Sequence, residues 1–205
     1  MSYTSEETDV LTEVVNIGVG RAAASLNELI GERIELSVPQ VTLCTLSEIQ
    51  GNVREDRGEL DTSIIQDFDG PTSGRAVLAF PGSSALKLGQ ILADLDEEPT
   101  ELDFDLRDVL NEVGNIVLNG VLGSLSNLLQ GNLRYTVPKL STETSFWELV
   151  QRHLARDENG ETPVLIADAR FQVAARNIGG SLILLFDCGG IQAITDSLLN
   201  TEGMP

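Results

Sequence analysis

Apolar residues along this chain follow helical spacing in two long segments, with short strand-like runs between them. The first segment predicts a helix over residues 5–30, opened by a capping box between Thr4 and Glu7. A second long helix is predicted from residue 103 or 105 to residue 129. Shorter amphipathic helices are expected around residues 88–95, 146–154 and 191–198.

Strand character lies between these helices. Short runs rich in β-branched and aliphatic residues predict strands at 33–38, 41–46, 75–80, 133–137, 164–176 and 181–186. The polar, glycine-containing stretch 51–74 predicts a loop with some hairpin character. Each half of the chain is therefore expected to contain a long helix, strands and a closing helix.

One group of residues occurs twice at the same spacing. Each member of the first copy returns 99 positions later: Asp9, Glu13, Asn16 and Pro39 become Asp108, Glu112, Asn115 and Pro138. Residues 74–80 similarly resemble residues 180–186. The repeats predict a single domain, residues 1–205, built from two halves of about 1–99 and 100–205, with the connection near Pro99 in the acidic stretch 94–105.

Composition narrows the classes of partner. The 205 residues are 41% apolar with a mean hydropathy of +0.03, and no apolar run is long enough to cross a bilayer, so we expect a cytoplasmic globular protein. A net charge of −19 disfavours nucleic acid and anionic membranes and favours a protein partner, although a solvated acidic surface explains the charge equally well. Two cysteines without metal-ligand spacing predict neither a disulfide framework nor a metal site.

On a helix, positions i, i+4 and i+7 share a face, so each Asp/Glu/Asn set should form one polar line. The alternative is an ordinary solvated helix face. A neighbouring line is expected to pack into the core in each copy, formed by Val10, Val14 and Ile17 and by Val109, Val113 and Ile116. Glycines in the same helices are expected to allow close approach of another backbone: Gly18, Gly20, Gly120 and Gly123.

The repeated set resembles the motif of the CheC, CheX and FliY chemotaxis phosphatases: Asp or Ser, three residues, Glu, two residues, Asn, twenty-two residues, Pro. Both copies fit it, and the flanking residues 16–23 and 112–116 are similar to the family's. Two motifs without an added flagellar-switch domain make the chain most similar to CheC. Val15 stands where the second copy has Gly114, and Arg21 stands where the family often has Asn, so the two sites need not be equivalent.

The resemblance implies a pseudo-twofold α/β fold, α+β in detail, with a sheet from both halves and the two motif helices side by side on one face. It also implies hydrolysis of the aspartyl phosphate of a CheY-like response regulator. No cofactor or metal of its own is expected, because Mg²⁺ belongs to the regulator's own acidic pocket.

The family motif implies a role for each residue. Asn16 and Asn115 would orient the attacking water, because a carboxamide accepts and donates hydrogen bonds without adding negative charge. Glu13 and Glu112 would contact the regulator's active-site lysine. The remaining members are expected to support docking or the helix start (Asp9, Asp108) and to shape the strand ends that brace the helices (Pro39, Pro138).

Other readings remain open. The same surface would also suit a non-enzymatic adaptor that sequesters phosphorylated regulator or binds a CheD-like deamidase, and a third reading is a flagellar-switch component. The lone His153, the aromatic pair Phe146 and Trp147, and Cys188 lack the neighbours that catalysis or ligand binding requires, so we expect no chemistry from them.

Overall fold

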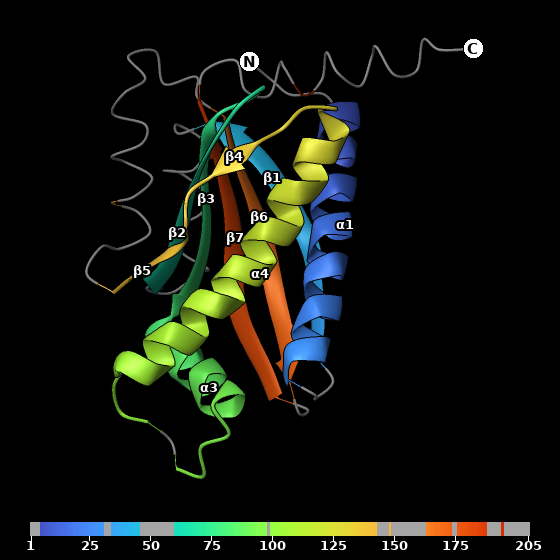
Figure 1. Cartoon of the computed structure of the whole chain (residues 1–205). Coiled ribbons are helices and arrows are strands. Elements are labelled where there is room, and N and C mark those ends of the chain that lie inside the picture. The colour runs from blue at the N-terminus through green and yellow to red at the C-terminus, as the bar shows by residue number, and fades with distance from the viewer. Residues whose placement is uncertain are drawn as a thin grey trace.

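The computed structural model describes residues 5–30, 34–45, 60–97, 99–142, 148, 163–173, 176–187 and 194 (Figure 1). Its helices are α1 (Ser5–Ile30), α3 (Gly82–Leu92) and α4 (Phe104–Leu128). Its strands are β1 (Ile34–Thr45), β2 (Leu60–Asp69), β3 (Gly74–Pro81), β4 (Arg134–Tyr135), β5 (Lys139–Ser141), β6 (Pro163–Val173) and β7 (Arg176–Phe186). The predicted bounds of both long helices are confirmed to within one residue.

The described strands form one antiparallel sheet in the order β1-β6-β7-β3-β2-β4, with β5 also paired to β2. Since no parallel pair occurs among them, the fold is α+β in the strict sense. Helices α1 and α4 lie against each other over one face of this sheet, as the resemblance implied (Figure 1).

The sheet is symmetric about its central pair, β3 and β7: each side continues with a second hairpin strand and then an outer strand. The hairpin β2–β3 precedes Pro99 in the chain, and the hairpin β6–β7 follows it. Each outer strand pairs with the hairpin of the opposite half: β1 with β6, and β4 and β5 with β2. Both halves therefore build the sheet together, as expected.

The loop predicted for residues 51–74 is wrong at residues 60–69, whereas the hairpin character expected there is confirmed, because β2 and β3 form an antiparallel pair joined by residues 70–73. Residues 60–69 form the long strand β2, which pairs with three other strands. Its buried residues include the polar Thr62, Ser63 and Gln66 as well as Ile64 and Phe68. These buried polar residues hide the alternation of apolar and polar positions by which a strand is recognised.

The line of residues predicted to pack into the core from α1 is confirmed in part, because Val14 is buried and Val10 is half-buried, but Ile17 is not. The buried positions of this helix are Leu11, Val14, Val15, Val19, Ala22 and Leu26. Ile17, expected in the core, is 44% exposed. Val15 and Ile17 lie about 200° apart around the helix axis, on nearly opposite sides, so a helix that buries Val15 exposes Ile17.

Glycine permits the close contact between α1 and α4, but only at two of the four expected positions. A Cβ on Gly18 would lie 2.5 Å from the Val121 Cα, and one on Gly120 would lie 2.7 Å from the Gly18 carbonyl oxygen. No real Cβ packs so tightly. Gly20 and Gly123 have nothing near an added Cβ, so the prediction of close approach was wrong for them.

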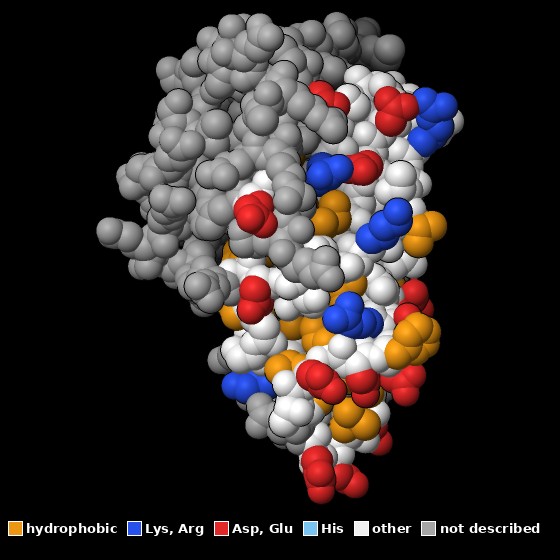
Figure 2. Space-filling model, turned by 90° about the vertical axis from the view of Figure 1, so that its left-hand side faces the viewer, with side chains coloured by type: hydrophobic (Ala, Val, Ile, Leu, Met, Phe, Trp, Pro, Cys, Tyr) orange, Lys and Arg blue, Asp and Glu red, His pale blue; other side chains and the backbone are white. Residues whose placement is uncertain are grey.

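Asp103 fixes the start of α4, because its Oδ1 accepts a hydrogen bond of 2.9 Å from the Leu106 backbone N–H. The acidic stretch before this cap is exposed on the surface at Asp94, Asp96, Glu97 and Glu101. Acidic side chains gather at this end of the described surface (Figure 2). None of the described helices combines the length and apolar character needed to span a bilayer.

Several predictions fall outside the described residues: the Thr4–Glu7 capping box, most of the helix at 146–154 with Phe146, Trp147 and His153, and Cys188. Of the predicted closing helix at 191–198, the structure describes only Ile194, which is helical and buried. Helix α3 begins at Gly82 rather than near residue 88, directly after the extended Pro81.

Candidate active site

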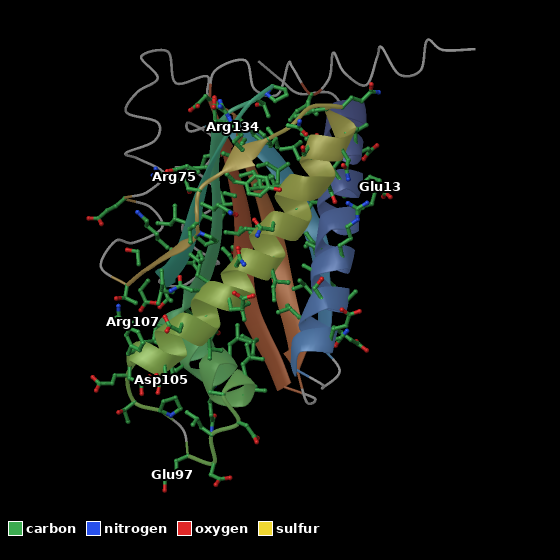
Figure 3. All side chains as sticks on the ribbon, in the orientation of Figure 1. Glu13, Arg75, Glu97, Asp105, Arg107 and Arg134 are labelled. Atoms are coloured by element: carbon green, nitrogen blue, oxygen red, sulfur yellow. The ribbon has the colours of Figure 1, made fainter. Side chains whose placement is uncertain are left out.

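The first motif lies on the solvent face of α1. Asp9, Glu13 and Asn16 are all exposed, whereas the adjoining Val14 and Val15 are buried. Glu13 points away from α4 and from the sheet (Figure 3). Exposed Ile17 follows one turn after Glu13. The polar line predicted for this helix is therefore confirmed as an accessible surface, with an apolar side chain beside it.

The second motif lies on the corresponding face of α4. Asp108 and Glu112 are exposed, and Asn115 is half-buried. Phe104 begins the same face and is 76% exposed. Among the described residues no hydrogen bond or ion pair joins this motif to the one on α1, so each helix presents its own Glu/Asn pair.

Asn115 takes part in a chain of side-chain amides that the sequence reasoning missed. Asn119 Nδ2 donates to Asn115 Oδ1 at 2.7 Å. Gln66 Nε2, from strand β2, donates to Asn119 Oδ1 at 3.0 Å and to the Thr136 carbonyl oxygen at 2.8 Å. The i, i+4 spacing of Asn115 and Asn119 was a usable signal. Nothing in the sequence pointed to Gln66, because its strand was predicted as a loop.

Both motif prolines lie where the pairing of an outer strand is interrupted. The β1–β6 register shifts between Ser37 and Gln40, around Pro39. Pro138 separates β4 from β5, each of which pairs with β2. Because proline lacks the N–H that a ladder needs, it suits such breaks. This arrangement agrees with the expected shaping of the strand ends.

The segment around Pro138 also braces α4. Pro138 itself is buried, and beyond it the Leu140 N–H donates to Asn111 Oδ1 on α4 at 2.9 Å. On its other side, Thr136 is tied to α4 through Gln66 and Asn119. These bonds hold the outer strand against the helix that carries Glu112 and Asn115.

The two departures between the motifs have structural counterparts. Gly114 faces Ile64 of β2 so closely that an added Cβ would overlap the Ile64 Cγ2, whereas Val15 at the matching place in α1 is buried without such a conflict. Arg21 reaches across to α4, where its Nη1 donates to Ser124 Oγ at 3.3 Å. The surroundings of the two motifs are therefore not identical.

The chemistry available on these faces is that of carboxylates and amides. A carboxylate attracts a cationic group on a partner, and an amide orients water or a phosphoryl oxygen. In the described part of the chain, no three His, Cys, Asp or Glu side chains gather as metal ligands would. The motif faces lie on convex helix surfaces, which suits contact with another protein.

Two family models match separate parts of the chain. The model described as "CheC-like family" matches residues 6–43, which contain the first motif. The model described as "Chemotaxis phosphatase CheX" matches residues 62–153, which contain the second. The "CheY-P phosphatase CheC" of Bacillus subtilis is 28% identical over 150 residues, covering 67% of each chain.

Solved structures share the fold. FliY from Thermotoga maritima is similar with a TM-score of 0.72 at 18% identity, over 98% of this chain and 99% of that one. The CheX chemotaxis protein from Desulfovibrio desulfuricans gives 0.55 at 13% identity, over 85% and 99%. A chain of the FliM–SpeE complex from H. pylori gives 0.69 at 11% identity over the full length of both chains. The two family models, the B. subtilis relative and the shared fold agree with the repeated motif, and they show that this chain is similar to the CheC, CheX and FliY proteins.

Proposed function

We propose that this protein hydrolyses the aspartyl phosphate of a phosphorylated CheY-like response regulator. The observation that carries the proposal is the repeated Glu/Asn pair on the outer faces of two helices packed against the sheet, with both glutamates and Asn16 exposed and Asn115 half-buried. The B. subtilis relative, a CheY-P phosphatase by name, supports it. We further propose that the two halves arose by duplication within one domain and that the protein acts in the cytoplasm.

In this mechanism the chain supplies position and charge rather than a nucleophile. An acyl phosphate is already activated, and the regulator holds the Mg²⁺ that neutralises its oxygens. Asn16 or Asn115 would hold a water in line with the bond that breaks. An amide is suited to this place because a carboxylate would be repelled by the phosphoryl group.

Glu13 and Glu112 would bind the lysine of the regulator's active site. Their exposure on the same helix face as the asparagines lets the lysine and the phosphoryl group be approached together. Asp9 and Asp108 lie one turn earlier and would contribute to docking. Pro39 and Pro138 would act only by placing the outer strands that support the helices.

Phosphate release tests the proposal. A CheY-like regulator, charged with acetyl phosphate in Mg²⁺ and freed of excess donor, is mixed with a substoichiometric amount of this protein. The wild type should release many equivalents of phosphate, and the Asn16→Ala/Asn115→Ala double variant should release no more than the regulator alone. Asn127→Ala, an exposed position on α4 away from the motif, serves as the matched control.

The adaptor reading predicts a different result. A sequestering protein would bind the phosphorylated regulator in a fixed ratio and leave the rate of phosphate release unchanged or lower. Full activity of the folded double variant would instead refute the assigned role of the asparagines. Binding of a CheD-like deamidase or of motor proteins is compatible with either result and is measured separately.

A further inference from the structure

We propose that Asn119 and Gln66 are positioning residues that hold the Asn115 carboxamide in one orientation, and that the second site is consequently the more active of the two. The part of this inference that concerns rates rests on the proposed phosphatase function. The part that concerns the orientation of Asn115 is independent of that function and is tested by a separate spectroscopic measurement.

Gln66, the buried end of the row of three side-chain amides, decides which group donates and which accepts in each of their hydrogen bonds. The Thr136 carbonyl oxygen can only accept, so the Gln66 group that faces it at 2.8 Å must be Nε2. The second hydrogen of this Nε2 then points to Asn119, which must offer Oδ1. Asn119 Nδ2 consequently faces Asn115, which must offer its own Oδ1.

Burial of Gln66 keeps its amide in this orientation. Gln66 is 1% exposed, and among the described residues its Oε1 has no hydrogen-bond partner. Turning the Gln66 amide over would place that oxygen against the Thr136 carbonyl and forfeit both bonds that Nε2 makes. A buried polar group without a partner costs free energy, so its retention here indicates that the two bonds of Nε2 set the orientation.

The outer end of the chain is the catalytic amide. With one lone pair of Asn115 Oδ1 engaged by Asn119, the side chain keeps its second lone pair and both Nδ2 hydrogens for water and substrate. Its plane is fixed before the regulator docks. A preorganised amide loses less rotational freedom when it orients a water than a freely rotating one does.

The first site has no residue equivalent to Asn119 that could orient Asn16. Gly20 occupies the position four residues after Asn16 that Asn119 occupies after Asn115. Asn16 is exposed, and its side chain makes no hydrogen bond to another described residue. Its amide is therefore free to rotate, and the two sites should differ in rate even though their motifs match.

The kinetic experiment isolates each site by removing the other asparagine. In the Asn16→Ala background, Asn119→Ala should lower kcat for phosphate release roughly fivefold to tenfold, the effect of losing one orienting hydrogen bond. In the Asn115→Ala background, the same substitution should leave the remaining rate unchanged. Asn127→Ala should leave both rates unchanged.

Three outcomes would overturn the proposal. An unaffected rate in the Asn16→Ala background would show that Asn119 does not act on Asn115. An equal loss in both backgrounds would show that Asn119 supports the fold rather than one site. A larger loss from Asn16→Ala than from Asn115→Ala would show that the first site is the stronger one.

A spectroscopic readout separates this inference from the proposed function. In ¹⁵N-labelled protein, ¹⁵N relaxation of the side-chain NH₂ signals should give a higher order parameter for Asn115 than for Asn16, and the Asn115 value should fall toward that of Asn16 in the Asn119→Ala variant. If the wild type releases no phosphate but these signals behave as stated, the phosphatase proposal fails and the positioning of Asn115 stands. If the signals of Asn115 and Asn16 are alike in the wild type, the positioning fails.

Discussion

Gly18 of α1 and Val121 of α4 face each other with no room for a side chain, since a Cβ on Gly18 would lie 2.5 Å from the Val121 Cα. This contact fixes the spacing of the two helices that present the motifs. Helix separations of 8–10 Å are usual, and small residues allow the closest of them. A side chain at Gly18 would therefore alter both the stability of the fold and the spacing of the two motif helices.

The first prediction uses two glycines of one helix. Gly18→Ala should lower the free energy of unfolding by about 1–3 kcal/mol, because the new methyl group must push the helices apart. Gly20→Ala should raise it by about 0.5–1 kcal/mol, because Gly20 lies in open space and alanine favours the helix. Urea denaturation measures both values. Equal effects of the two substitutions would contradict the proposed contact.

The second prediction concerns the exposed Ile17 beside the first motif. Ile17→Ser should change the free energy of unfolding by less than about 0.5 kcal/mol, because the side chain is 44% exposed. In the Asn115→Ala background it should raise KM for the phosphorylated regulator if Ile17 touches the docked partner. Steady-state phosphate release measures KM.

Ile116 provides the matched comparison, because it follows Asn115 as Ile17 follows Asn16 but packs against the core. Ile116→Ser should therefore destabilise the fold measurably, by about 1 kcal/mol or more. A stability loss as large for Ile17→Ser would mean that Ile17 supports the fold instead of the docking surface.

The third prediction tests the role of the glutamates. Glu112→Gln in the Asn16→Ala background should lower kcat/KM by roughly thirtyfold, equivalent to about 2 kcal/mol, because an ion pair with the regulator's lysine is lost. Glu13→Gln should act likewise on the first site. Glu28→Gln, an exposed position of α1 beyond the motif, should have little effect.

Salt dependence strengthens this test. The wild-type kcat/KM should fall as ionic strength rises, because exposed charges are screened before they meet. The glutamine variants should show a shallower dependence. A variant that keeps the wild-type salt dependence would show that the glutamate faces no charge on the regulator.

The sequence allowed the long helices and the motif surface to be predicted because their signals are local. Asp9, Glu13 and Asn16 share a face by helix geometry alone, and the structure exposes all three. The failures concern contacts with distant segments. Ile17 and Val15 are both apolar, and only the sheet beneath α1 decides which of them is buried.

Strand β2 was missed for a related reason. Gln66 reads as a loop residue, but the structure satisfies its amide with Asn119 and Thr136, which lie 53 and 70 residues further along the chain. Tertiary hydrogen bonds of this kind leave no periodic trace in the sequence. The support of Asn115 by a second amide was therefore invisible until β2 was placed beneath α4.

The exchange of outer strands between the halves has a consequence for how the chain can be divided. Strand β1 has its partner β6 beyond Pro99, and β2 takes β4 and β5 from beyond the same point. A protein cut there would yield two fragments, each with bare strand edges that only the other fragment fits. Each fragment would need the other to complete its sheet. The two halves of this single chain therefore depend on each other as the subunits of an obligate dimer do.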